Sequence, residues 1–170
     1  DMDLTQYSKL TAWTISLCGF FSRFPRAIIS NSYSAKKYHI EKFGYAKEKF
    51  QIIPNGFDLK NFKPNETAKI KIRQELGIEN NAMVIGHIGR YDPMKDHQSF
   101  LKAAQIVKNN FPDCIFVLAG RDVNWQNDSI SNSIKKLSLE DSVHLLGERR
   151  DVDELMNSFD GFCSSSAFGE

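Results

Sequence analysis

Positively charged side chains occur in short turns that follow apolar segments of the chain. The clearest case is Gly89-Arg90-Tyr91-Asp92-Pro93-Met94-Lys95, in which Arg90 and Lys95 bracket the turn. Arginine offers a planar fork of donors that suits phosphate oxygens, and lysine adds a compact positive charge. A helix is predicted to begin near Asp96, and a helix N-terminus attracts anions. These residues indicate a diphosphate clamp, with solvated loop charges as the alternative interpretation.

Other nucleotide and metal motifs are weak or missing. No GxxxxGK[ST] loop occurs and no GxGxxG follows a strand, which disfavours P-loop hydrolases and standard NAD-binding domains. The triplets Asp1-Met2-Asp3 and Asp151-Val152-Asp153 have the spacing of a metal-bound nucleotide site, but Glu154 favours a helix-capping box at Asp151. Metal-ligand spacing is also missing from the histidines, which are His39, His87, His97 and His144. We therefore predict no metal site, and we assign His87 and His144 to the core or edge of predicted strands.

The composition is that of an ordinary globular chain. It has 170 residues, of which 41% are hydrophobic and 25% charged, enough for one domain or one domain plus part of another. A net charge of +1 provides no long-range attraction for nucleic acid or an anionic membrane. The cysteines (Cys18, Cys114 and Cys163) are odd in number and widely spaced, so we expect reduced, mostly buried thiols in a cytosolic protein. No signal peptide is predicted, because the sequence starts with Asp1-Met2-Asp3. No membrane-spanning segment is predicted either, because the apolar stretch 10–24 is short and broken by polar residues.

Hydrophobic periodicity predicts alternating helices and strands. The predicted helices cover residues 4–23, 34–43, 68–76, 96–111, 128–137 and 151–158. The predicted strands cover residues 26–30, 50–53, 83–88, 115–118, 143–146 and 161–163. Short apolar strands alternating with amphipathic helices are typical of an α/β fold, a Rossmann-like parallel sheet with helices on both faces. Ligands bind beyond the carboxyl ends of such strands, where the turns containing Gly89, Gly120 and Gly147 and the segment 164–170 should meet.

A series of motifs then resembles one known family, the retaining GT-B glycosyltransferases of group 1, or family 4, type. The resemblance covers residues 25–170 well and residues 1–24 loosely. Its motifs are Ile52-Ile53-Pro54-Asn55-Gly56-Phe57-Asp58, Phe62-Lys63-Pro64, Arg73-Gln74-Glu75-Leu76-Gly77-Ile78, Ile88-Gly89-Arg90 with Lys95-Asp96, Phe111-Pro112, Leu118-Ala119-Gly120, Val143-His144-Leu145-Leu146-Gly147, Asp151-Val152, Ser165-Ser166 and Gly169-Glu170. Each motif is weak alone, but their order and separations together are specific.

The resemblance implies roles for individual residues. Arg90 and Lys95 match the pair that binds the donor diphosphate, and Glu170 matches the first glutamate of an E-x7-E motif that contacts the donor sugar. The residues that match strand ends near the nucleotide are Gly89, Gly120, Gly147 and Arg149. No cofactor is implied, because the nucleotide-diphosphate sugar is the donor substrate.

The resemblance also implies a domain organisation. Residues 1–50 match the last part of an N-terminal acceptor domain, residues 51–66 an interdomain linker with its hinge at Asn55 and Gly56, and residues 67–170 a C-terminal donor-binding domain that is incomplete at its C-terminal end. The second glutamate and most of the acceptor domain are expected to lie outside this sequence. The chain alone is therefore expected to be inactive.

The implied enzyme is a hexosyltransferase that transfers a sugar with retention of configuration, in cell-surface polysaccharide or glycolipid synthesis. Its expected partners are a nucleotide sugar and a sugar or lipid-linked acceptor, without nucleic acid. We expect it in the cytoplasm, with peripheral contact at the inner membrane face as an option. The alternatives are another GT-B enzyme, such as a sugar-nucleotide epimerase or a phosphorylase, and a non-catalytic nucleotide-binding module. Pyridoxal phosphate absorbance would identify a phosphorylase, and titration with nucleoside diphosphates would test the non-catalytic module.

Overall fold

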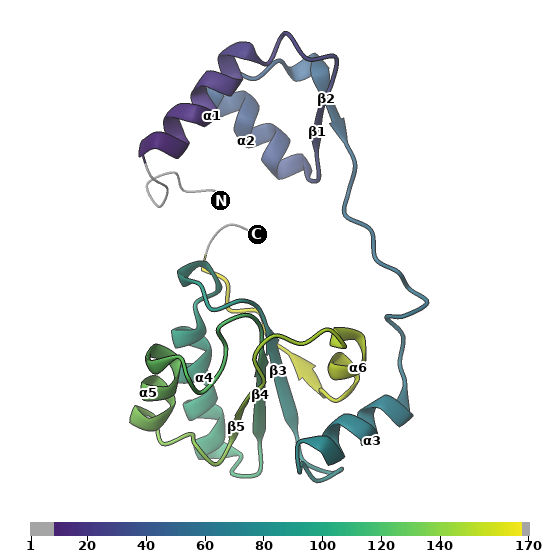
Figure 1. Ribbon diagram of the computed structural model, residues 1–170, viewed down its shortest axis with the longest axis vertical. Helices are drawn as coiled ribbons and strands as arrows, with labels where there is room; N and C mark the ends of the chain where they lie inside the picture. The colour runs from purple at the N-terminus through teal and green to yellow at the C-terminus, as the bar shows by residue number, and fades with distance from the viewer. Residues whose placement is uncertain (1–8, 168–170) are drawn as a thin grey trace. The chain divides into compact units, whose positions relative to one another are not determined.

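The chain forms two compact units. The computed structural model describes residues 9–167, and the boundary between the units falls between Asp58 and Leu59 (Figure 1). No helix within this described range is long and apolar enough to cross a membrane.

The first unit combines two helices with a small parallel sheet. Its elements are α1 (Lys9–Phe21), β1 (Ile28–Ser30), α2 (Tyr33–Phe43), the 3-10 turn η2 (Lys47–Lys49) and β2 (Phe50–Ile52). Strands β1 and β2 pair in parallel, with Ile28 opposite Phe50. Helix α2 begins where the Ser32 hydroxyl accepts the Ala35 amide at 3.0 Å, and it ends at Gly44 with a left-handed φ of 64°. The predicted helix over 4–23 is confirmed from Lys9 onward, and its first residues lie outside the described range.

The second unit is a four-stranded parallel sheet with helices on both faces. Its elements are α3 (Glu66–Glu75), β3 (Val84–Ile88), the 3-10 turn η3 (Pro93–Lys95), α4 (His97–Asn110), β4 (Ile115–Ala119), α5 (Asp128–Lys136), β5 (Val143–Leu145), α6 (Val152–Asn157) and β6 (Gly161–Phe162). The strand order is β5-β4-β3-β6, and every pair is parallel. The predicted Rossmann-like α/β fold is thus confirmed.

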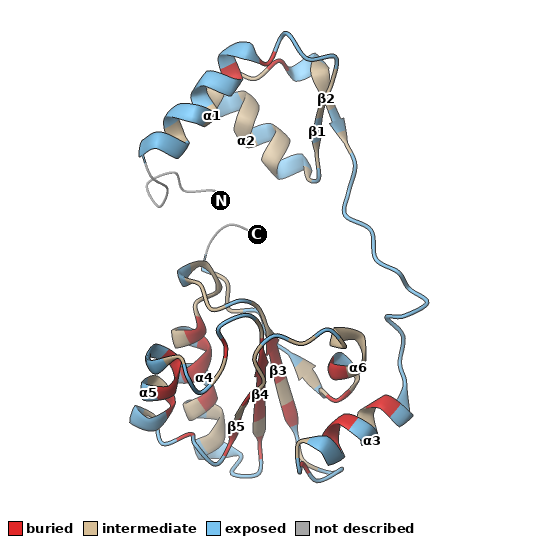
Figure 2. Cartoon of the chain, viewed as in Figure 1, coloured by how far each residue is buried: buried red, intermediate tan, exposed pale blue. Residues whose placement is uncertain are grey.

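Strand β4 shows how the sequence builds both layers. Successive side chains of a strand point to opposite faces of the sheet. Phe116 and Leu118 pack into a core with α4 and α5, whereas Val117 and Ala119 pack into a second core with α3 and α6. Figure 1 shows these two helix pairs on opposite sides of the sheet, and Figure 2 shows its central strands buried between them. A continuous apolar strand therefore means burial on both faces.

The direction of strand addition reverses within this sheet. The chain runs from β3 to β4 to β5 on one side, and then returns through α6 to place β6 on the other side of β3. In open α/β sheets, ligands bind outside the carboxyl ends of the strands where the order reverses. We call the carboxyl ends of β3 and β6 the switch point.

Two sequence-based predictions are wrong. The capping box is absent, because the Asp151 side chain makes no cap hydrogen bond to α6 and instead binds Arg149. The cysteines are free as predicted, but only Cys114 is buried, whereas Cys18 and Cys163 are exposed. Both exposed cysteines lie where few elements of the described chain pack, on α1 and just after the edge strand β6.

Candidate functional site

Three glycine-containing turns meet beyond the carboxyl ends of β3, β4 and β5. Gly120 has φ 153°, and a Cβ atom on it would lie 2.1 Å from the carbonyl oxygen of Gly89. No side chain fits there, so the turns after β3 and β4 can approach at backbone distance. The amide of Gly120 donates to the carbonyl of Gly147 at 2.8 Å, and that of Gly89 to Ala119 at 2.9 Å. The predicted convergence of Gly89, Gly120 and Gly147 is confirmed.

Arg90 lies in the turn after β3 and is held there by a neighbouring carboxylate. Its Nε donates to Asp92 at 3.2 Å, and Asp92 also accepts the Met94 amide at 2.9 Å. That backbone hydrogen bond, together with Arg90, lowers the pKa of Asp92, so the carboxylate is charged at neutral pH. The Arg90 side chain remains about half exposed, which leaves it accessible to a ligand.

Lys95 ends the same turn, beside the start of α4. Its stem lies over Gly89, since a Cβ atom on Gly89 would meet Lys95 Cγ at 3.4 Å. The next residue, Asp96, adopts a left-handed φ of 44° and caps α4 by accepting the Ser99 amide at 3.1 Å. Asp is among the few residues other than glycine that enter this conformation readily. The turn therefore places Lys95 at the positive end of a 14-residue helix.

The segment after β6, residues 163–167, closes onto this turn. Ser165 donates its hydroxyl to the Lys95 carbonyl at 2.7 Å, and Lys95 Nζ donates to the Ser166 hydroxyl at 3.3 Å. The Ala167 amide donates to the Met94 carbonyl at 2.9 Å. Glu170, the predicted sugar-contacting residue, lies outside the described residues.

These groups together make a site suited to a polyanion. Two cations, serine hydroxyls and the start of α4 gather at the switch point, where backbone donors and positive charge can meet phosphate oxygens. Within residues 9–167, no group of three or more His, Cys, Asp or Glu side chains could hold a metal ion. Arg90 and Lys95 contribute positive charge at this site.

Arg149 is engaged elsewhere. Its guanidinium binds Asp151 at 2.8 and 2.6 Å and Glu75 at 2.6 and 3.3 Å. Hydrogen bonds from Arg149 lower the pKa of both carboxyl groups, and the two carboxylates raise the pKa of Arg149. Both edges of the guanidinium are thus occupied, and its predicted role in nucleotide binding remains a prediction.

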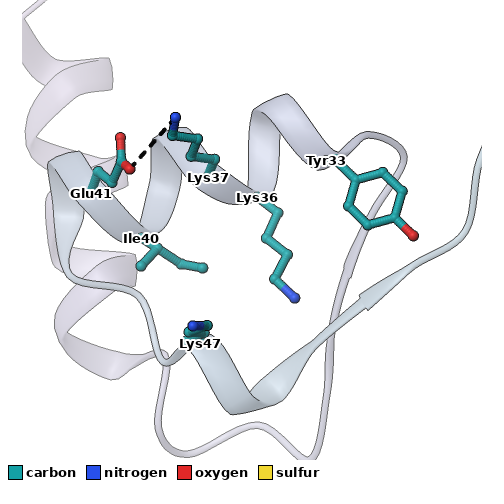
Figure 3. Close-up of a pocket in the computed structure, with 6 residues that line it drawn as sticks. All are labelled: Tyr33, Lys36, Lys37, Ile40, Glu41 and Lys47. Atoms are coloured by element: carbon teal, nitrogen blue, oxygen red, sulfur yellow. Dashed lines mark ion pairs between the residues drawn. The ribbon is translucent and has the colours of Figure 1, made fainter.

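A concave region lies in the first unit, with a volume of about 470 Å³ (Figure 3). It is lined by Tyr33, Lys36, Lys37, Ile40, Glu41 and Lys47. Lys37 and Glu41 form an exposed ion pair at 4.0 Å, and Lys36 lies 5.9 Å from the centre of the Phe50 ring. Exposed pairs of this kind contribute little free energy. We assign this region to the solvated surface, because it lacks a buried polar group that would hold a ligand.

A known protein family matches the part of the chain that contains the switch point. Residues 68–170 match the family described as glycosyl transferases group 1. The chain belongs to this family. The match covers all of β3 to β6, and therefore every turn that forms the site.

Individual glycosyl transferases resemble the chain over different lengths. A galactosyltransferase of Escherichia coli, named as acting from UDP-Gal on alpha-D-GlcNAc-diphosphoundecaprenol, is 34% identical over 116 residues, covering 67% of this chain and 30% of that protein. The crystal structure of Anabaena HepE in complex with UDP and glucose has a TM-score of 0.83 and 27% identity, covering 99% of this chain and 45% of HepE. Sucrose-phosphate synthase of Thermosynechococcus elongatus has a TM-score of 0.77 at 18% identity, covering 98% of this chain and 43% of that structure, and shares the fold. The chain thus spans less than half the length of these relatives.

Proposed function

We propose that this chain forms most of the donor-binding half of a glycosyltransferase that uses a UDP-sugar. The observation that carries the proposal is the joining of the Arg90–Lys95 turn to the serine segment after β6 at the switch point. HepE, a relative that matches nearly the whole chain, was crystallised with UDP and glucose. The Escherichia coli relative also takes its sugar from UDP-Gal. Both support uridine diphosphate as the group that this site binds.

In the proposed reaction, a hexose passes from the donor to an acceptor hydroxyl with retention of configuration. The bond between the anomeric carbon and the β-phosphate oxygen breaks, the bond to the acceptor oxygen forms, and the acceptor proton passes to the departing diphosphate. Arg90 and Lys95 stabilise the negative charge that develops on this leaving group, as preorganised positive groups do in other enzymes. No metal ion or protein nucleophile is required by this scheme. Glu170 is proposed to contact the sugar.

The acceptor is proposed to bind mainly outside this chain, in the remainder of an N-terminal domain. The Escherichia coli relative is named for a lipid-diphosphate acceptor. A lipid-linked glycan in cell-surface polysaccharide synthesis is therefore the proposed acceptor class, which would bring the complete enzyme to the cytoplasmic membrane face. The present chain alone is proposed to bind the donor without catalysing transfer.

Neutralising either cation tests the clamp. Arg90→Ala and Lys95→Ala in the full-length protein should each weaken UDP binding, measured by calorimetry, by about tenfold or more, because a charge-assisted hydrogen bond contributes about 1.5–3 kcal/mol. Binding of uridine, which has no phosphates, should change much less. The matched control is Lys135→Ala, which removes one exposed charge from α5 and should bind UDP like the parent. Unchanged UDP binding by folded Arg90→Ala would show that the clamp assignment is wrong.

A further inference from the structure

A buried histidine lies beneath the switch point. His87 belongs to β3, and only 1% of its surface is exposed. Its Nδ1 lies 2.9 Å from the carbonyl oxygen of Cys163, the first residue after β6. A carbonyl oxygen only accepts hydrogen bonds, so Nδ1 carries the proton and donates it. A side chain of one strand therefore binds the backbone of its neighbour where that neighbour ends.

The position of this hydrogen bond matters for the path of the chain. Pairing between β3 and β6 ends at Gly86 opposite Phe162, and the amide of Cys163 still donates to the Gly86 carbonyl at 2.9 Å. The next acceptor along the chain, the Cys163 carbonyl, accepts the hydrogen bond from the imidazole of His87. Beyond this point the chain turns toward Lys95, where Ser165 and Ala167 make their hydrogen bonds. His87 is thus the last anchor before the segment that completes the phosphate site.

The His87 ring is itself fixed by its neighbours. His97, the first residue of α4, meets it edge to face with ring centres 4.7 Å apart, and Phe100 packs against it at 5.1 Å. His97 is 2% exposed. Its burial, and to a lesser extent the neighbouring His87, lower the pKa of His97 to about 4. Interactions with Gly89, Asp96 and Asp92 act in the opposite direction but are smaller. His97 is therefore uncharged at neutral pH. A neutral ring at this place packs against His87 without electrostatic repulsion.

We propose that His87 is a positioning residue for the donor site: its Nδ1–H holds the segment 163–167 against the Arg90–Lys95 turn. The proposal rests on the proposed function for the identity of the ligand, but not for the loop contact itself. His87 does not touch the donor. Its effect passes through the Cys163 carbonyl to Ser165 and Ser166, and so to the shape of the surface that receives the diphosphate.

Two substitutions separate the hydrogen bond from the packing. His87→Leu keeps an apolar side chain in the core but removes the donor. His87→Asn keeps a donor, because the Asn side-chain nitrogen is as many bonds from the backbone as Nδ1. His144→Leu is the matched control, since it removes a half-buried histidine from β5 without touching β6.

Amide hydrogen exchange in the full-length protein measures the loop directly. His87→Leu should speed exchange of the Ala167 amide by about tenfold, because one lost hydrogen bond changes an equilibrium by about that factor. The amide of Phe116, which donates to Ser142 in the central sheet, should exchange as in the parent and so exclude global unfolding. His87→Leu should also raise the dissociation constant of UDP, and KM for the UDP-sugar, by about tenfold with a smaller change in kcat. In His87→Asn, the exchange rate, the dissociation constant and KM should each lie within about threefold of the parent value. This is smaller than the change of about tenfold that is expected when the hydrogen bond is lost.

The outcomes keep the two proposals distinct. If Ala167 exchanges equally in His87→Leu and the parent, or if His87→Asn behaves like His87→Leu, the positioning role is wrong. If the parent binds no UDP, the proposed function fails, while the exchange rates of Ala167 still decide the role of His87.

Discussion

At the scale of single residues, burial separates a structural arginine from the arginine that we propose binds the diphosphate. Arg73 in α3 is 1% exposed, and its Nε donates to the Ser158 carbonyl at 3.1 Å. Its Nη1 donates to the Asn80 and Ala82 carbonyls at 2.7 and 3.0 Å, and its Nη2 to Asp160 at 2.7 Å. Asp160 in turn accepts the Val84 amide at the start of β3. Arg73 thus joins α3, β3 and the turn before β6, whereas Arg90 leaves half of its side chain to solvent.

Removing Arg73 should therefore destabilise the second unit. Arg73→Met should lower the free energy of unfolding by about 3–5 kcal/mol, because it leaves Asp160 and several carbonyl groups without their partner. The control Arg121→Met changes a side chain that is 68% exposed and should alter stability by no more than about 0.5 kcal/mol. Urea titration of both variants measures the difference. Equal stabilities would mean that the Arg73 network contributes nothing.

At the scale of elements, Arg149 links the end of α3 to the start of α6 through Glu75 and Asp151. Hydrogen bonds from Arg149 hold the pKa of both carboxyl groups below their ordinary values of 4.5 and 3.8. A carboxyl group with a depressed folded-state pKa stabilises the fold above its unfolded pKa. That stabilisation is lost as the pH falls through the folded-state value. The link should therefore weaken in acid, below about pH 4.5.

Replacing Glu75 should make unfolding less sensitive to acid. Between pH 5 and pH 3, the parent should lose more unfolding free energy than Glu75→Gln, because the variant has no carboxylate to protonate at Arg149. Glu140→Gln, a change at an exposed site after α5, should follow the parent curve. Urea titrations across this pH range give the slopes. If the unfolding free energies of the parent and Glu75→Gln change equally with pH, the Glu75–Arg149 pair does not contribute to acid sensitivity.

Local sequence patterns predicted the helices and strands. Strand order and side-chain partners were not predicted, because they depend on contacts between residues that are distant in sequence. The strands at 84–88 and 115–119 and the helix between them follow from periodicity and turn residues that lie close together in sequence. The place of β6 beside β3 was not predicted, because strand order depends on packing across the whole sheet. The same limit explains the error at Asp151, since its competing partner Arg149 is also bound by Glu75, 74 residues away in sequence.

The sequence also predicted only part of the candidate site. The Arg90–Lys95 turn and the glycines could be found because residue type alone indicates phosphate chemistry and close backbone approach. His87 was assigned to the core or edge of a strand, because no sequence spacing shows that its ring binds the carbonyl of Cys163. The serines after β6 carry a weak signal, which becomes specific only when Lys95 is placed beside them.

At the scale of the whole molecule, the segment between β2 and α3 joins the two units and is exposed. Residues 53–65 contain no helix or strand, and Phe57 and Leu59 are each 76% exposed. The segment ends where the Asn65 amide donates to Asn157 of α6 at 2.7 Å and the Asn65 side chain caps α3. By contrast, the two cores of the second unit are built from residues between Ile72 and Leu155. Cleavage in residues 53–65 therefore removes no core contact from that unit.

Limited chymotrypsin digestion should therefore cut first after Phe57 or Leu59, because exposed loops are the preferred sites of nicking. Mass spectrometry should identify a fragment that begins at Asp58 or Lys60, and this fragment should still unfold cooperatively. The control variant Phe57→Ser/Leu59→Ser removes the two most exposed cleavage sites of the segment, leaves Phe62, and should slow the first cut without changing stability. A first cut within β4, which Figure 2 shows buried, would contradict the assignment of this unit as an independent fold. Loss of cooperative unfolding after cleavage in residues 53–65 would contradict it equally, since it would mean that the core depends on contacts from the first unit.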